Sequence, residues 1–199
     1  CDGDFIMAET KFKFKKCELL PNEGSSLDEN YNIIGGGPIV DYYESIDSPT
    51  ISMNLTFIDV DQVISRKGIF GGEYVNLTVE VDGYSDFKLT QKKHNLMLNS
   101  VRNIVTETNK QVATLEFVSV ESIVNETARV NKKFTGNVSQ TVSELLVSYK
   151  KGIQTKKKLD KHNSANSYSF VGNLKRPFDT VQWLSLIHIS EPTRHRRIA

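Results

Sequence analysis

Ile51-Ser52-Met53-Asn54-Leu55-Thr56-Phe57 and Val75-Asn76-Leu77-Thr78-Val79-Glu80-Val81 are the two stretches that decide the fold, because each alternates apolar and polar residues without a break. Successive side chains of a β-strand point to opposite faces of a sheet, so this alternation is typical of a strand with one buried face. Pro49 precedes the first stretch and Gly71-Gly72 the second, as is common before strands. The two stretches therefore predict two half-buried strands.

Further strands are predicted on both sides of these two. Asp82-Gly83 indicates a hairpin turn from the second strand into residues 84 to 90. Two segments rich in β-branched residues, 96 to 106 and 112 to 118, flank a polar turn, and residues 11 to 19 predict the first strand. We expect the antiparallel strands between residues 38 and 118 to close into a β-barrel or a small sandwich.

The apolar period changes after residue 118. Val138, Val142, Leu145, Leu146 and Tyr149 recur at helical spacing behind Asn137, which with Gln140 fits a capping box, and Lys150-Lys151-Gly152 predicts the helix end. A shorter helix is expected from Ser119 toward Val130, a loop or hairpin over 153 to 169, and a break at Pro177. The predicted fold is mainly β: an antiparallel β-barrel over 7–118, then a small, incomplete α+β domain over 119–184.

The charges of the chain are balanced. Its 25 Lys and Arg against 24 Asp and Glu give a formal net charge of +1, which provides no long-range attraction for nucleic acid or anionic lipid. Lys156-Lys157-Lys158 with Lys161 lacks the interleaved aromatic residues that stack on bases, so a solvated loop is the simpler interpretation. No apolar run approaches the ~20 residues that cross a bilayer. We expect no specific nucleic-acid binding and no membrane insertion.

No residue pattern predicts catalysis, a cofactor or a metal. The glycines at 35–37 and 71–72 fit neither a dinucleotide fingerprint nor a phosphate loop, and His94 has no partner at a recognisable spacing. The carboxylates that could form an acid/base pair fall on predicted loops, where solvated turn residues are the more common case: Asp41, Glu44 and Asp47, or Asp59 and Asp61. We therefore expect a protein that is not an enzyme and has no cofactor.

Both ends of the sequence differ in character from the rest. Residues 1–6 precede Met7 and are expected to be upstream read-through. Leu184-Ser-Leu-Ile-His-Ile-Ser-Glu-Pro-Thr-Arg194 resembles the in-frame translation of a transposon-type sequencing adaptor, so we expect 185–199 to be an artefact. Without these ends Cys17 is the single cysteine, and no internal disulfide is predicted.

Several segments together resemble a known family, and they do so in order and spacing along residues 40 to 184. They are residues 43–59, 68–73, 117–126, 130–136 and 168–184. They are similar to the first tube domain, and to the start of the insertion domain, of the baseplate central hub protein of T-even-like contractile-tailed bacteriophages.

The resemblance implies a structural protein. Members of that family fold as two related antiparallel β-barrel tube domains interrupted by α+β insertions, and three copies form a ring that joins the threefold spike to the sixfold tail tube. The type VI secretion spike protein uses a similar base. The implied partners are further copies of the chain in a homotrimer, the central spike protein, the tail tube protein and the baseplate wedge proteins. The implied location is the virion tail baseplate, after assembly in the host cytoplasm.

A candidate subunit interface follows from the first alternating stretch. The polar face of Ser52, Asn54 and Thr56 is uncharged, which suits an interface or lumen, although an ordinary outer barrel face fits equally well. The alternative function is a monomeric β-rich glycan-binding module, for which Tyr42, Tyr43, Tyr74 and Tyr84 would line a groove. Aromatic residues near strands are more often core or strand-pair residues.

Overall fold

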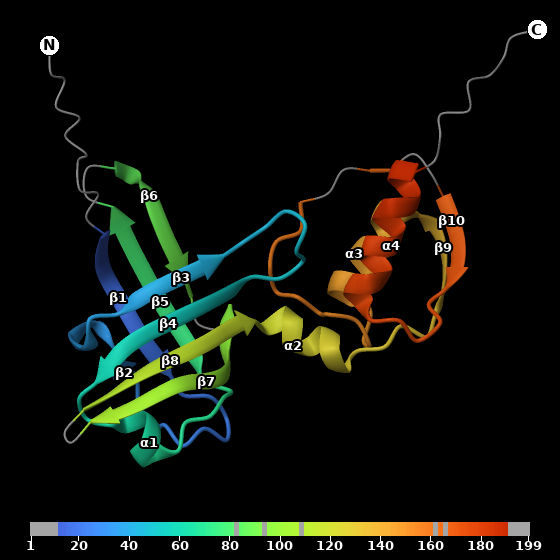
Figure 1. The fold of residues 1–199 in the computed structure, drawn as a ribbon. Helices are drawn as coiled ribbons and strands as arrows, with labels where there is room; N and C mark the ends of the chain where they lie inside the picture. The colour runs from blue at the N-terminus through green and yellow to red at the C-terminus, as the bar shows by residue number, and fades with distance from the viewer. Residues whose placement is uncertain are drawn as a thin grey trace, which may run out of the picture. The chain divides into compact units, whose positions relative to one another are not determined.

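The computed structural model describes residues 12–81, 84–92, 95–107, 110–160, 163–164 and 167–190. The chain divides into two compact units, Cys1–Val120 and Glu121–Ala199 (Figure 1). The predicted leader, residues 1–6, lies outside the described residues. Of the adaptor-like segment, 185–190 belongs to a helix and 191–199 lies outside the described residues.

The first unit is one antiparallel sheet. In chain order its described strands are β1 (Phe12–Leu20), β2 (Tyr31–Asn32), β3 (Ile39–Tyr43), β4 (Ser52–Asp59), β5 (Tyr74–Val81), β6 (Tyr84–Gln91), β7 (Leu96–Glu107) and β8 (Lys110–Ser119). Hydrogen bonding links them in the order β2-β1-β5-β7-β8-β4-β3, with β6 paired to β5. Two short helical segments, η1 (Ile34–Gly36) and α1 (Val63–Lys67), lie between strands in the sequence.

This sheet rolls around a single core. Buried side chains of β1, β4, β5, β7 and β8 belong to one cluster, with large members such as Leu19, Met53, Phe57, Leu77 and Phe117. The rings of Tyr31 in β2 and Phe57 in β4 lie 6.4 Å apart between centroids, although four strands separate β2 from β4 in the sheet order, so the sheet is curved around this core. The prediction of a mainly β fold built from antiparallel strands is confirmed, and closure of the sheet into a barrel stays a prediction. Within the described residues the hydrogen-bonded path ends at β2 and β3.

The alternating stretches form strands for the expected reason. Along β4 the inward residues Met53, Leu55 and Phe57 are buried, and β5 alternates in the same way. The hairpin from β5 to β6 is present, although residues 82 and 83 of its turn lie outside the described residues. The period-2 pattern thus specified both the strands and the face that each buries.

The second unit mixes helices with a two-stranded sheet. Its elements are α2 (Val120–Thr127), β9 (Lys133–Asn137), α3 (Val138–Ser143), the π-helical turn η2 (Glu144–Ser148), β10 (Ser167–Val171) and α4 (Pro177–Ser190). As predicted, Asn137 caps a helix, where its side chain accepts a hydrogen bond from the Ser139 N–H. Three aromatic rings join β9, β10 and α4: Phe134 stacks on Phe170, and Phe170 meets Trp183 edge-on, with both ring-centroid distances at 5.3 Å.

Two predictions for this unit were wrong, and one was confirmed in part. Pro177 begins α4 instead of breaking a segment, because the first helical position needs no N–H donor. Of the loop or hairpin predicted over 153–169, the described residues up to 164 contain no helix or strand, but β10 begins at Ser167 and pairs with β9. The helical segment that Asn137 caps ends at Ser148, before the lysines that were predicted for its last turn. Gly152 does not adopt the left-handed conformation of a helix cap. A glycine is needed there because a Cβ would overlap the Leu145 carbonyl oxygen. In the described part of the chain, no helix has the length and apolar character needed to cross a membrane.

Candidate functional site

Ser52, Asn54 and Thr56 lie on the outer face of β4, as the alternation predicts. All three are half-buried, and the intervening side chains point into the core. β4 is an inner strand of the sheet, and over Ser52–Thr56 it is paired with β3 on one side and β8 on the other, so this stretch presents side chains and not a free strand edge. The three residues therefore share one face, as the candidate interface requires; whether that face binds another subunit stays a prediction.

The surroundings of these residues are not uncharged. Asn54 lies between Asp41 of β3 and Glu116 of β8 in direct register. Glu116 accepts a hydrogen bond from Ser100 at 2.6 Å and forms an ion pair with Arg102 at 2.7 Å. The uncharged polar side chains thus belong to β4 alone, and the strands on either side place charged side chains next to them.

Next to these polar residues, sequence reasoning missed an exposed aliphatic row. Ile58, Val112 and Val105 are direct cross-strand partners on β4, β8 and β7. Their exposed fractions are 41%, 38% and 60%, so three aliphatic side chains meet solvent side by side. The sequence of β4 does indicate this row, because Ile58 is an apolar residue at a position that the alternation assigns to the outer face. Contiguous exposed apolar side chains mark contact surfaces more often than isolated ones do.

A groove lies where the rolled sheet is open. Phe12 and Phe14 of β1, Val40 and Tyr42 of β3, and Leu89 of β6 are among its lining residues, and its volume is about 710 Å³. The Tyr42 hydroxyl accepts a hydrogen bond from Gln91 Nε2 at 3.1 Å and donates one to Glu44 Oε2 at 3.2 Å. Burial, followed by the nearby Glu44 carboxylate, raises the pKa of Tyr42 to about 12. The phenol therefore stays neutral and serves as a polar link across an otherwise apolar seam.

The predicted carboxylate pairs are not brought together into a site. Asp59 is buried and accepts hydrogen bonds from Tyr31 Oη at 3.0 Å, from the Ile64 N–H at 2.9 Å and from Gln111 Nε2 at 3.0 Å, so its oxygens are occupied by structural partners. Asp61, Asp41, Glu44 and Asp47 are exposed. Within the described ranges no group of three His, Cys, Asp or Glu side chains could hold a metal ion. His94 and Lys161 lie outside the described residues.

The four tyrosines proposed for a glycan site do not form a common platform. Tyr42 packs against the core, whereas Tyr43 points to the opposite face of the same strand. Tyr74 begins β5, opposite Leu20 of β1. The side chain of Tyr84 lies outside the described residues.

Comparison of the whole fold with solved structures identifies related architectures. A tail protein from Neisseria meningitidis superimposes with a TM-score of 0.52 at 10% sequence identity, over 87% of this chain and 45% of that one. This likeness shows the fold, and the chain spans less than half the length of the Neisseria protein. No protein-family model matches the sequence, and no curated protein matches it.

Two further structures share features at lower similarity. One is an E. coli protein described as a component of the type VI secretion system with structural similarity to the T4 bacteriophage tail proteins gp27 and gp5; its TM-score is 0.42 at 9% identity, over 90% of this chain and 40% of that one. The other is a 43 kDa tail protein of prophage MuSo2 from Shewanella oneidensis, with a TM-score of 0.44 at 12% identity, over 85% of this chain and 48% of that one.

Proposed function

We propose that this chain is a noncatalytic structural component of a phage-type tail. The observation that carries the proposal is the fold shared with the Neisseria meningitidis tail protein over 87% of the chain. The polar residues that could do chemistry support a structural role, since the buried Asp59 is used to hold strands and a helix together. A tail component acts through its contacts, so the outer face of the rolled sheet is the functional surface.

The finer form of the proposal is a baseplate hub. In this form three copies make a ring that adapts the threefold central spike to the sixfold tail tube during assembly and host penetration, with wedge proteins outside. The order of the hub-like segments from residue 43 to residue 184 supports it. The protein would be assembled in the host cytoplasm and reside in the virion tail baseplate.

We assign the subunit contact to the outer face of β4 and its neighbours. The aliphatic row of Ile58, Val112 and Val105 supplies apolar area, and Ser52, Asn54 and Thr56 supply uncharged polar groups beside it. A buried apolar centre with a polar margin is the usual composition of a protein–protein interface. The glutamate and arginine of the neighbouring strands would lie at that margin.

The experiment is the mass of the purified full chain in solution, measured by light scattering over a concentration series. The wild-type chain is expected to self-associate into a trimer. The double variant Val105→Lys/Val112→Lys is expected to remain monomeric with an unchanged melting temperature, because both side chains already face solvent in the single chain. The matched control Ile46→Lys/Phe70→Lys places the same charges on other exposed apolar residues and should assemble normally.

Two results would count against the proposal at different levels. A wild-type chain that stays monomeric and does not bind the tail tube protein from the same genome removes the tail role. A trimer that persists in Val105→Lys/Val112→Lys keeps the tail role but removes this surface as the contact.

The glycan-binding alternative is less well matched to the structure. The groove that contains Tyr42 is lined mainly by apolar side chains, with few of the hydrogen-bonding groups that sugar hydroxyls require. This alternative predicts a monomer that binds glycans saturably, and a glycan array with the purified chain would detect it.

A further inference from the structure

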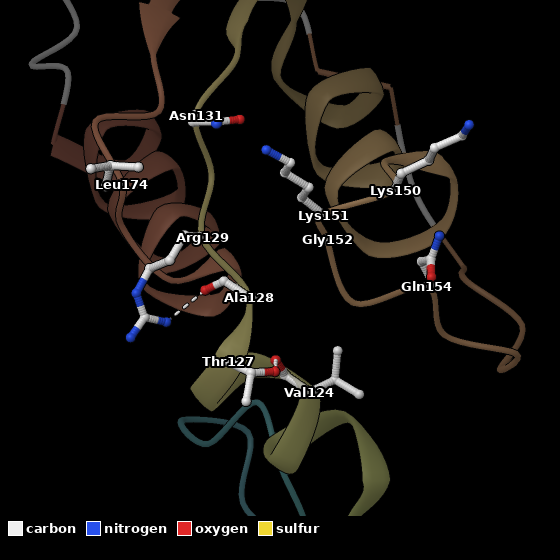
Figure 2. A pocket seen from close by; sticks show the side chains of 10 residues that line it. All are labelled: Val124, Thr127, Ala128, Arg129, Asn131, Lys150, Lys151, Gly152, Gln154 and Leu174. Carbon is white, nitrogen blue, oxygen red and sulfur yellow. Dashed lines mark hydrogen bonds between the residues drawn. The ribbon is translucent and has the colours of Figure 1, made fainter.

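The second unit contains a basic pocket that the proposed function does not use. Its volume is about 480 Å³. It is formed by the end of α2 and the chain after it, by the turn that follows η2, and by Leu174 (Figure 2). The lining residues are Val124, Thr127, Ala128, Arg129, Asn131, Lys150, Lys151, Gly152, Gln154 and Leu174.

The charges around this pocket are one-sided. Arg129, Lys150 and Lys151 line it, and no carboxylate is among the lining residues. Other cations of the same unit have acidic partners: Lys132 pairs with Glu144, Lys157 with Glu121, and Arg176 with Glu126. Within the described part of the chain, Lys150 and Lys151 form no ion pair. Among the residues that the structure describes, the pocket thus concentrates positive charge from Lys150 and Lys151 that no acidic side chain pairs with.

The lysine pair is held by an ordered backbone. The Gly152 N–H donates to the Tyr149 carbonyl at 2.8 Å, and the Ile153 N–H donates to the Leu145 carbonyl at 3.1 Å. Gly152 packs so closely on the Leu145 carbonyl that a Cβ would overlap it. These contacts fix the turn, so the positions of the two lysine backbones are set before any partner arrives.

The opposite wall is tied to the same turn. The Tyr149 hydroxyl donates a hydrogen bond to Asn131 Oδ1 at 2.8 Å. Arg129 Nη1 donates to the carbonyls of Glu126 and Ala128, at 2.9 and 2.7 Å, where α2 ends. A guanidinium held by neutral carbonyls keeps its full charge, so Arg129 contributes to the positive field of the pocket.

The cations do not converge on one point. In Figure 2 the Lys151 ammonium extends toward Asn131, the Lys150 ammonium points away from it, and the Arg129 guanidinium turns toward Ala128. A small anion needs several donors within hydrogen-bond distance of one position. Separated cations interspersed with apolar side chains such as Val124 and Leu174 instead suit an extended ligand with several negative charges and some apolar groups.

We infer that this pocket binds an acidic segment of a partner protein. Carboxylates at intervals along the segment would pair with Lys150, Lys151 and Arg129, and an apolar side chain between them would contact Leu174, which is exposed. Nucleic acid is the less suitable polyanion because no aromatic side chain lines the pocket for base stacking. The inference does not depend on trimer formation, since all the residues belong to the second unit.

The test is fluorescence anisotropy of the full chain with a short labelled peptide rich in glutamate, with leucine at intervals. Binding is expected, and it should weaken as salt rises because partly exposed charges are screened. The variant Lys150→Glu/Lys151→Glu should bind about tenfold more weakly, or worse, since two favourable pairs become repulsive. The control Lys156→Glu/Lys158→Glu changes the net charge equally at exposed lysines that do not line the pocket and should bind as the wild type does.

Several outcomes would overturn the inference. Equally tight binding of the peptide by Lys150→Glu/Lys151→Glu and by the wild type would show that these lysines do not bind it. An equal loss of binding in both double variants would show that the net charge of the chain, and not the pocket, attracts the peptide. Displacement of the peptide by equimolar inorganic phosphate would instead indicate a small-anion site. Tighter binding of a single-stranded oligonucleotide, lost in Lys150→Glu/Lys151→Glu, would make the pocket a nucleic-acid site.

Discussion

Gln111 Nε2 donates a hydrogen bond to Asp59 Oδ2 at 3.0 Å, and the two residues are also cross-strand partners of β8 and β4. Their exposed fractions are 1% and 0%. The same Oδ2 accepts the Ile64 N–H of α1, and Oδ1 accepts the Tyr31 hydroxyl of β2. One buried carboxylate therefore connects two inner strands, an edge strand and a helix, and it is the main polar anchor of the first unit.

Asp59→Ala should destabilise the chain strongly. The substitution leaves the Gln111 amide and the Ile64 N–H buried without their acceptor, and we expect a loss of about 3 kcal/mol in the free energy of unfolding. Urea denaturation measures it. Asp61→Ala, two residues away and exposed, should change stability by less than about 0.5 kcal/mol. Similar midpoints for the two variants would show that Asp59 is not an anchor.

Two adjacent glycines should respond differently to alanine. A Cβ at Gly36 would overlap the Ile58 carbonyl oxygen and lie 3.2 Å from Phe57 Cδ2, whereas a Cβ at Gly35 meets nothing within 4 Å. Gly36→Ala is expected to cost about 2 kcal/mol of stability, because β4 must shift to admit the methyl group, while Gly35→Ala is nearly neutral. Thermal and urea denaturation of both variants compare them directly. Equal stabilities would contradict the packing of η1 on β4.

Cys17 should make the folded state lose stability in alkali. Burial, with a smaller contribution from Glu18, raises the pKa of the thiol from 9.0 to about 12. Below pH 9 both states hold the proton; between pH 9 and 12 the unfolded chain releases it and the folded chain retains it, so stability falls as pH rises. In Cys17→Ala the decline should be smaller over that interval, whatever its stability at neutral pH. If the free energies of unfolding of the wild type and Cys17→Ala fall equally between pH 9 and 12, the raised pKa of Cys17 is refuted.

Glu121 should contribute stability that is lost in acid. Burial alone would raise its pKa, but hydrogen bonds from Lys157 Nζ at 2.9 Å and Thr155 Oγ1 at 2.7 Å outweigh this and lower it. A lowered folded-state pKa gives stability that is present above the ordinary value of 4.5 and disappears as the pH falls through the folded value. Carbon-detected NMR titration of the Glu121 carboxyl measures the shift.

Removing Lys157 should reverse part of the lowering of the Glu121 pKa. Lys157→Met is expected to raise the pKa of Glu121 and to reduce stability at pH 7 by about 1 kcal/mol. Lys158→Met, the exposed neighbour, is the matched control and should leave both quantities unchanged. An unaltered Glu121 titration in Lys157→Met would show that the pair has no energetic role.

The long strands of the first unit were predictable because their determinants are local, whereas the short elements β2, η1 and α1 were not predicted. Alternation along β4 and β5 specifies strand and buried face together, since successive side chains must point in opposite directions. β9 and β10 were not predicted because each is only five residues long and their paired residues are 30 to 38 positions apart in the sequence. Pro177 was misassigned because proline signals a break inside a helix but is favoured at its first position.

The candidate surfaces also differ in whether local sequence or long-range packing determines them. The sequence by itself determined that Ser52, Asn54 and Thr56 share an outward face, because period 2 settles this within one strand. Only the tertiary structure decided that Val105 lies beside Val112 and Ile58: irregularities in the β7–β8 register place Val101 against the core and Val105 outside. The basic pocket likewise joins residues 124–131, 150–154 and 174. Register and long-range packing depend on the free energy of the whole fold, which no local period encodes.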